Sequence, residues 1–187
     1  MAYDFFGIPV SEINVWLIWI LPFAAALIIP AVGKFSKIST GRVAVAFAAM
    51  SAISAATLLP MALEAHEIHH QIMWIDAIGI KAGVLADPLS IIMANVVGWI
   101  SFLIMCYSTG YMKGDKDIMR FWFWMMFFIG SMQLIVLSDN LLQIFFGWEG
   151  VGLASYALIS FWYRDKKKDH VGQEGRSALG VMEYFSP

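Results

Sequence analysis

Apolar residues gather in five long runs along the chain, separated by polar segments. The runs occupy residues 14–33, 43–63, 88–108, 121–137 and 141–163. A bilayer core of about 30 Å is crossed by about 20 apolar residues in a helix that rises about 1.5 Å per residue. Because each run has about this length, the sequence predicts an all-α, polytopic transmembrane helical bundle with five spans within residues 1–163.

Residues that favour helix ends mark several of the predicted boundaries. The predicted caps are Ser39 and Thr40 for the second span, Asp87 before Pro88 for the third, and Asp139 with Asn140 for the fifth. Three prolines inside apolar runs predict kinks or early helix ends. They are Pro22, Pro30 and Pro60.

Positive charges predict the orientation of the spans, because Lys and Arg are retained on the cytoplasmic side. Eleven of the 12 Lys and Arg residues lie between spans one and two, between spans three and four, or after span five, and only Lys81 lies on the other side. The N-terminus should therefore be outside, residues 64–87 should be external, and residues 164–187 should form a cytoplasmic loop or tail. This tail ends without a terminal element, so we expect a chain cut in mid-loop.

Aromatic residues near the inner ends of the spans predict an interfacial belt. They are Tyr107, Tyr111, Trp122, Trp124, Trp162 and Tyr163.

Composition narrows the possible functions. The chain is 60% hydrophobic and 14% charged with a formal net charge of −2, whereas soluble domains are about 25% charged. A soluble domain is therefore excluded, and no basic excess supports binding to nucleic acid. The single cysteine, Cys106, predicts neither an internal disulfide nor a metal cluster, so we expect no cofactor in this chain.

Glu149 is the one acidic residue in the middle of a predicted span, at its ninth position. An ionised carboxylate near the bilayer centre costs about 2.5–3.5 kcal/mol on insertion scales, so such residues are functional by default. Tyr156 and Ser160 share the Glu149 face of an ideal helix and are candidate neighbours in a water chain. We therefore interpret Glu149 as a proton-relay carboxylate. Gly147, Gly150 and Gly152 leave room for either a neighbouring helix or water.

Three further polar residues within the spans are interpreted as hydrogen-bonding links between helices. They are Asn95, Gln133 and Gln143.

A second pattern lies in the external segment, where His66, Glu67 and His70 match H-E-x-x-H. On a helix, this pattern places two histidines one turn apart to bind zinc and a glutamate to activate water. Catalytic zinc has three protein ligands, and only Asp76 or His69 could supply the third. These residues are therefore a weak candidate metal site, and solvated loop histidines are the preferred interpretation.

The stretch LSDNLLQIFFGWEGVGLASYALISFWY at 137–163 resembles the fifth-helix signature of the large antiporter-like subunits of respiratory complex I, the L subunit or mitochondrial subunit five. ADPLSIIM at 86–93 and YSTGYM at 107–112 resemble the same family in the same order. The resemblance extends from about residue 74 onward. The methionine-rich sequence and hydrophilic tail resemble the archaeal version, the methanogen dehydrogenase that oxidises reduced coenzyme F-420 and reduces methanophenazine.

This resemblance implies a proton-translocating subunit of a redox-driven complex in a prokaryotic plasma membrane. In that family, the fifth-helix glutamate, which maps onto Glu149, is paired with a lysine on a broken seventh helix, and neither that helix nor the long lateral helix is present in these 187 residues. The implied partners are other membrane-arm subunits, the lipid bilayer and protons, with iron–sulfur clusters and flavin in the partner subunits.

Other functions stay open from sequence alone. The A subunit of a multisubunit Na⁺/H⁺ antiporter carries the same signature without a redox partner. A membrane zinc metalloprotease would rest on His66, Glu67 and His70 alone. A purely structural bundle is opposed by the cost of placing Glu149 at membrane depth.

Overall fold

The computed structural model describes residues 4–5, 8–64, 67–75 and 80–161. The helices are α1 (Val10–Phe35), α2 (Lys37–Ala56), α3 (Leu59–Leu63), α4 (Pro88–Tyr111), α5 (Ile118–Leu137) and α6 (Leu141–Ile159). The strands are β1 (Asp4–Phe5), β2 (Ile8–Pro9), β3 (Ile68–Ile75) and β4 (Ile80–Ala86).

Five segments of the described chain are long and apolar enough to cross a membrane, which confirms the predicted helical architecture. They are Glu12–Lys34, Ser39–Leu63, Pro88–Tyr111, Ile118–Leu137 and Leu141–Ile159. The direction in which they cross stays a prediction from the charge distribution.

Several helix ends differ from the predicted boundaries. Ser36, with extended backbone at φ −158°, is the N-cap of α2, so the predicted caps Ser39 and Thr40 lie inside the helix. The apolar run shows only which residues are apolar enough for the membrane. The helix itself can begin earlier, because polar residues before the run can also adopt helical backbone. At the other end of the molecule, α6 stops at Ile159 and Ser160 is its C-cap, so the helix is shorter than the predicted 141–163 span.

The three prolines have different outcomes. Pro22 and Pro30 both lie inside the continuous helix α1, so neither ends it. Pro60 lies in the first turn of the short helix α3, just after α2 has ended at Ala56. Proline is tolerated in a first helical turn because the N–H that it lacks would have no partner there. The helix is therefore interrupted between α2 and α3, close to Pro60, as the sequence predicts.

The predicted caps Asp87 and Asn140 are confirmed, whereas Asp139, predicted to cap the last span together with Asn140, does not cap α6. Asp87 and Ser90 form a capping box on α4, in which Asp87 Oδ1 accepts the Ser90 N–H at 2.7 Å and Ser90 Oγ accepts the Asp87 N–H at 2.9 Å. Asn140 caps α6 because its Oδ1 accepts the Gln143 N–H at 2.9 Å.

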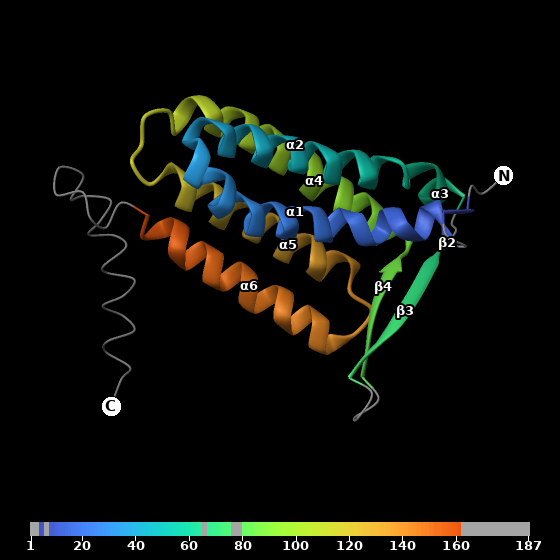
Figure 1. Cartoon of the computed structure of the whole chain (residues 1–187). Coiled ribbons are helices and arrows are strands. Elements are labelled where there is room, and N and C mark those ends of the chain that lie inside the picture. Colours follow the sequence, from blue (N-terminus) through green and yellow to red (C-terminus); the bar gives the residue numbers. More distant parts are fainter. Residues whose placement is uncertain (1–3, 6–7, 65–66, 76–79, 162–187) are drawn as a thin grey trace, which may run out of the picture.

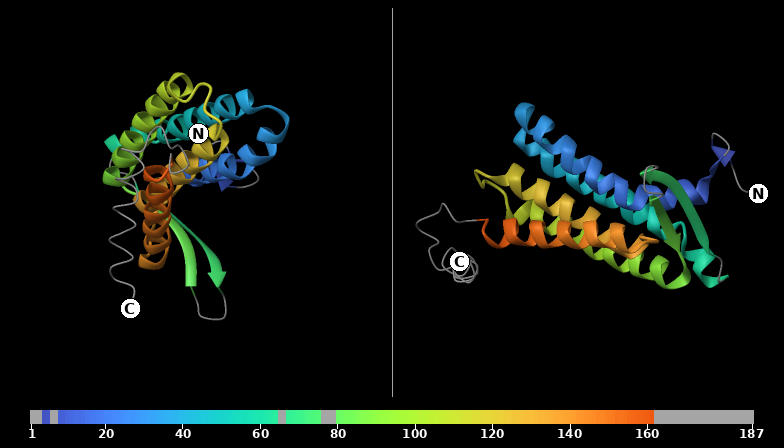
Figure 2. Two further views of the ribbon diagram at one scale, coloured as in Figure 1. Left: turned by 90° about the vertical axis from the view of Figure 1, so that its left-hand side faces the viewer. Right: turned by 90° about the horizontal axis from the view of Figure 1, so that it is seen from below.

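Four long helices form the body of the bundle, and α6 lies outside it against α5 (Figures 1 and 2). Helix α1 packs between α2 and α5, and α4 packs on α2 and α5. Small residues allow α2 to approach its neighbours closely. The buried alanines of α2 are Ala44, Ala48, Ala52 and Ala55.

The buried side chains form two clusters, one toward each end of the bundle. The first includes Val15, Ile18, Leu58, Ile91 and Leu137, and residues of the β3–β4 hairpin pack into it. The second surrounds Trp122 and Met126 of α5 at the end where α4 connects to α5, with partners on α1, α2 and α4. The hairpin is thus part of the core rather than a peripheral loop.

The segment predicted as an external excursion contains the antiparallel hairpin of β3 and β4, in which Ile68 pairs with Ala86 and Ile72 with Ala82. It lies at the same end of the bundle as the start of α1 and the α5–α6 turn (Figure 1). An isolated bridge between Val84 and Ser138 joins the hairpin to that turn. The hairpin therefore covers the end of the bundle at which α6 begins.

Candidate functional site

Helix α6 contacts α5 through a stripe of small or polar residues. Its buried residues are Gln143, Gly147, Gly150 and Ala154. A Cβ at Gly147 would lie 2.7 Å from Ile135 Cγ1 and 3.0 Å from the Ser131 backbone oxygen, so the glycine is required for this close approach. Nothing lies within 4 Å of a Cβ placed at Gly152. Two of the three glycines near Glu149 thus accommodate a helix neighbour, and the third faces open space.

Glu149 lies on the face of α6 that is turned away from α5. It is the ninth of 19 residues in the helix and is exposed in the described chain. Gly152 at i+3 and Tyr156 at i+7 share this face, and Tyr156 is 48% exposed. Among the described helices, Glu149 is the acidic residue farthest from a helix end. The geometry therefore presents a carboxyl group at mid-span on a surface that the described helices leave uncovered.

Tyr156 and Ser160, the two candidate neighbours of Glu149 in a water chain, lie at different distances from it along α6. Seven residues of helix separate Glu149 from Tyr156 by about 10 Å along the axis, so a link between them requires water or another side chain. Ser160 is the C-cap of α6, and its hydroxyl donates to the Tyr156 backbone oxygen at 2.9 Å. The face thus leads from Glu149 toward the end of α6, but the two residues do not contact Glu149 directly.

The other polar residues of the spans hold elements together. Asn95 of α4 donates to the Ala55 backbone oxygen of α2 at 2.9 Å, and Gln133 of α5 donates to the Ala94 oxygen of α4 at 3.0 Å. Gln143 accepts the Gly83 N–H of β4 at 3.1 Å. Asn95 and Gln133 link helices as predicted, whereas Gln143 fixes the hairpin to α6.

Sequence reasoning missed a polar cluster around Asp139, whose side chain is only 2% exposed. Asp139 Oδ2 accepts from Gln71 Nε2 at 2.6 Å and lies 3.1 Å from His69 Nε2, both on β3. Asn140 Nδ2 donates to Asp139 Oδ1 at 2.7 Å and to the Lys81 backbone oxygen at 3.0 Å. These bonds attach both strands of the hairpin to the α5–α6 turn. The four-residue segment 76–79, which contains Gly79 and separates two strand-length runs, was the available signal for a hairpin.

The pKa of Asp139 is below its ordinary value. Burial acts to raise it, but hydrogen bonds from Gln71, His69 and Asn140, together with the charge of His69, outweigh that effect. Asp139 is therefore held as a carboxylate that stabilises the docked hairpin.

The H-E-x-x-H pattern does not have the helical geometry that a zinc site requires. Glu67 precedes β3 and His70 lies within it, while His66 lies outside the described residues. His70 Nδ1 accepts from Trp16 Nε1 at 3.2 Å, and its Nε2 lies 3.8 Å from Glu12 Oε2. No group of three potential metal ligands occurs in the part of the chain that the structure describes. His69 and His70 instead attach the hairpin to the α5–α6 turn and to α1, respectively.

Comparison with known proteins links this architecture to one family. Residues 73–122 match the family described as NADH-Ubiquinone oxidoreductase (complex I), chain 5 N-terminus, and residues 138–174 match NADH:quinone oxidoreductase/Mrp antiporter, TM. The chain is similar to the N-terminal part of the complex I subunit L/5 and Mrp antiporter-like family. Its multiple membrane-spanning helices agree with membership of a multi-pass membrane protein family.

Individual curated relatives are similar to this chain over part of their length. The NADH-quinone oxidoreductase subunit L of Rickettsia bellii is 40% identical over 152 residues, which are 79% of this chain and 24% of that protein. The Escherichia coli subunit L is 39% identical over 113 residues, or 60% of this chain and 18% of that protein. The chain thus spans about a quarter or less of the length of these curated relatives.

Solved structures show the same fold. The Mrp complex of Dietzia sp. DQ12-45-1b contains a chain that aligns with a TM-score of 0.65 and 23% identity, covering 78% of this chain and 16% of that one. The archaeal membrane-bound sulfane sulfur reductase aligns with a TM-score of 0.71 and 14% identity, covering 88% of this chain and 33% of that one. The helical arrangement of this chain therefore resembles that of chains in these two membrane complexes.

Proposed function

We propose that the chain acts in a proton-translocating membrane-arm subunit of a complex I-like redox-driven pump, with Glu149 as the proton-carrying carboxylate. The observation that carries the proposal is the position of Glu149 at mid-span on the uncovered face of α6. A carboxylate at that depth is stable only beside protein or water. Further helices of an antiporter-like subunit, or a partner subunit, would cover this face and complete a path for protons.

Within this proposal, the residues have separate tasks. Glu149 takes up and releases a proton, and Tyr156 orders water between it and the end of α6, with Ser160 at the exit of the helix. The close packing of Gly147 and Gly150 on α5 keeps the helix axis fixed, so the carboxyl group is held at constant depth. Within this proposal, electron transfer takes place in partner subunits that carry iron–sulfur clusters and flavin, because the single cysteine of the sequence, Cys106, cannot by itself hold a metal cluster.

The test is a Glu149→Gln variant in the assembled complex, in proteoliposomes. Glutamine preserves size and hydrogen bonding but cannot release a proton at neutral pH, so the number of protons moved per electron should fall while the subunits still assemble. Glu149→Asp should retain partial pumping. Glu67→Gln is the matched control, because Glu67 is exposed and precedes β3, outside the membrane-spanning segments. An unchanged proton-to-electron ratio in Glu149→Gln would reject the role of this carboxylate.

The A subunit of a multisubunit Na⁺/H⁺ antiporter is a second candidate, favoured by the similarity of the fold to the Mrp complex. Glu149 would keep its role, but ion exchange would replace redox energy. Purification of the native assembly distinguishes the two functions. Iron–sulfur subunits among the co-purifying proteins support the redox pump, whereas small hydrophobic subunits alone support the antiporter.

The electron donor and acceptor distinguish the types of complex I-like pump to which the chain could belong. We propose the methanogen type, in which reduced coenzyme F-420 is oxidised and methanophenazine is reduced in a prokaryotic plasma membrane, on the resemblance of the methionine-rich sequence and the hydrophilic tail. Membranes that contain the complex should then oxidise reduced coenzyme F-420 faster than NADH. Oxidation of NADH alone with a quinone as acceptor would assign the chain to the quinone-reducing type.

A further inference from the structure

The end of α6 lies beside the start of α5, because the two helices run in opposite directions (Figures 1 and 2). Ala154 and Phe161 of this end are buried, at 0% and 6% exposure, whereas none of the six residues between them is buried. Tyr156 and Ser160, the candidate neighbours of Glu149, lie within that stretch. Phe161 is therefore the residue at which the end of α6 is next held after Ala154.

Arg120, in the first turn of α5, contacts Phe161 in two ways. Its Nη2 donates to the Phe161 backbone oxygen, and the carbon of its guanidinium group lies 4.8 Å from the centre of the Phe161 ring. The ring of Phe121 meets the same ring edge-on, at a centroid distance of 5.9 Å. Backbone oxygens at the end of a helix have no partner within the helix, and a cation is favoured there by the helix dipole. One side chain thus binds both the backbone and the ring at the end of α6.

The guanidinium group is suited to this double contact. It is planar, so it can stack on a ring and donate hydrogen bonds in its own plane, which the single ammonium group of lysine cannot do. Arg120 is also attached at its own helix start, where its N–H donates to the Asp117 backbone oxygen at 2.9 Å. Its Nη2 lies 3.8 Å from the Asp117 carboxylate, but the two side chains are 31% and 45% exposed, so water screens this ion pair. The contact with Phe161 is therefore the main interaction of the guanidinium group among those described here.

The start of α6 is attached separately. Asn140 Nδ2 donates to the Lys81 backbone oxygen at 3.0 Å, and Gln143 accepts the Gly83 N–H at 3.1 Å. Loss of the Arg120 contact would therefore release the end of the helix and leave its start in place.

A small movement of the released end is enough to matter. Ser160 lies ten residues beyond Gly150, where α6 packs closely on α5, and this is about 15 Å along the helix. A tilt of about 10° at that point would displace Ser160 by about 3 Å, the length of one hydrogen bond. The direction of the last turns of α6 thus decides whether polar groups there can share water with Glu149.

We propose that Arg120 is a positioning residue for proton transfer, which fixes the end of α6 so that Tyr156 and Ser160 stay on the line that leads from Glu149. This inference rests on the proposed function, because the line has a task only if Glu149 carries protons. Arg120 binds α6 at Phe161, about 18 Å along the helix from Glu149. It therefore acts through the position of the helix and not by contact with the carboxyl group.

The first test measures a distance between two spin labels on the full chain in lipid nanodiscs, by pulsed electron paramagnetic resonance. The labels are attached to Thr109→Cys on α4 and Ile159→Cys on α6, both exposed positions, with Cys106 replaced by serine. A hydrogen bond to a charged group changes an equilibrium constant about tenfold or more. Arg120→Met should therefore raise the population with a displaced α6 end about tenfold, seen as a second distance.

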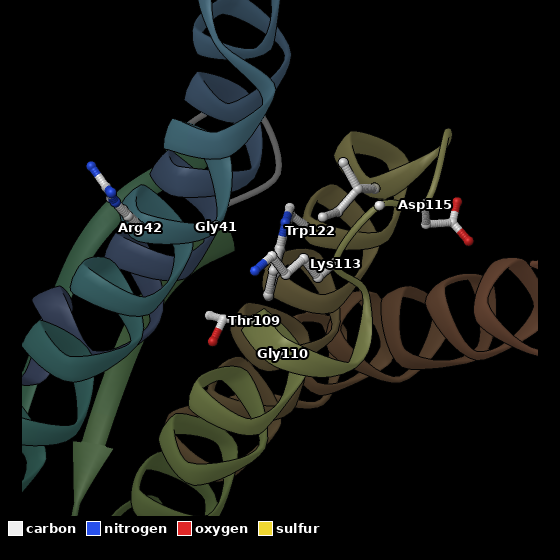
Figure 3. Close-up of a pocket in the computed structure, with 9 residues that line it drawn as sticks. Gly41, Arg42, Thr109, Gly110, Lys113, Asp115 and Trp122 are labelled. Carbon is white, nitrogen blue, oxygen red and sulfur yellow. The ribbon is translucent and has the colours of Figure 1, made fainter.

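A control pair and a control variant accompany this measurement. Labels on Leu89→Cys and Leu141→Cys, at the opposite ends of α4 and α6, should keep their distance in Arg120→Met because the start of α6 stays attached. Arg42→Met removes the same charge from the start of α2. Arg42 is exposed and points away from Trp122 of α5 (Figure 3), so this variant should leave both distances unchanged.

The second test is the number of protons moved per electron by the assembled complex in proteoliposomes. Arg120→Met should lower this ratio, while Arg42→Met should not. Arg120→Lys keeps the charge and can donate to the Phe161 backbone oxygen without stacking on the ring, so it should restore part of the ratio. Met and Lys are both long, unbranched side chains, so a role in packing alone would not separate them.

Three results would overturn the proposal. An unchanged distance from position 109 to position 159 in Arg120→Met would mean that α6 keeps its position without this contact. The same displacement in Arg42→Met would mean that the charge of this end, and not the contact with Phe161, holds the helix. A displaced helix with an unchanged proton-to-electron ratio, where Glu149→Gln lowers that ratio, would mean that the end of α6 takes no part in proton transfer.

Failure of the proposed function has a different signature. It would show as an unchanged ratio in Glu149→Gln, whatever the labels report for the Arg120 variants. If Arg120→Met does not fold, Phe161→Leu removes the stacked ring and keeps the backbone oxygen, and its distance and ratio decide in the same way.

Discussion

Replacing Gly147 with alanine should weaken the packing of α6 on α5. An added Cβ would lie 2.7 Å from Ile135 Cγ1, 3.0 Å from the Ser131 backbone oxygen and 3.2 Å from the Ile135 backbone nitrogen. The last two atoms belong to the α5 backbone and cannot rotate away as a side chain can. The new methyl group can therefore be accommodated only if one helix moves away from the other.

The size of the effect follows from two opposing terms. Overpacking a close contact costs about 1–3 kcal/mol, whereas replacing glycine with alanine inside a helix gains about 1 kcal/mol in intrinsic propensity. Gly152→Ala is the matched control, since it lies on the same helix and its Cβ would meet nothing within 4 Å. The propensity gain is common to both variants, so the difference between them measures the packing cost at the α5–α6 contact.

The assay is reversible unfolding of the chain in mixed micelles, with the helical circular dichroism signal followed as sodium dodecyl sulfate replaces dodecyl maltoside. Gly147→Ala should have a free energy of unfolding about 1–3 kcal/mol below that of Gly152→Ala. If the two variants are equally stable, the close contact between α6 and Ser131 does not exist in the protein. The orientation of the Glu149 face, which depends on this contact, would then be wrong as well.

Two further predictions concern the end of the bundle that carries the hairpin. Asp139→Asn should expose the amides of β3 to hydrogen exchange at neutral pH, because the buried carboxylate that accepts from Gln71 and contacts His69 is lost. Its folded pKa is depressed, so the wild-type hairpin should be fully docked above the ordinary value of 3.8 and should lose protection as the pH falls through the lower folded value, whereas the variant should show no such transition. Asp87→Ala should cost about 1 kcal/mol in the same unfolding assay, because the capping box of α4 is lost. Hydrogen bonds from Ser90 lower the pKa of Asp87, so this difference should be full above pH 3.8 and should shrink as the pH falls through the lower folded value, and a constant difference would contradict the capping role.

Local sequence signals predicted the helices well and the side-chain environments less well. Asp87 and Asn140 cap helices as their positions indicate, because capping depends on residues within one turn. Trp122 was expected in an interfacial belt and is instead 1% exposed in the core, while Tyr107 and Tyr111 are exposed as expected. All three are aromatic residues near a helix end, and only the position of neighbouring helices distinguishes them.

The sequence by itself determined the five apolar spans, the isolation of Glu149 at mid-span and the charge asymmetry, because bilayer thickness and the cost of a buried charge act on each segment separately. The tertiary structure decided which face of α6 carries Glu149 outward, since that depends on how Gly147 meets Ser131 of another helix. It also decided that His69 and Asp139, 70 residues apart, contact each other. Such contacts depend on the packing of distant segments, and no local pattern of residues records them.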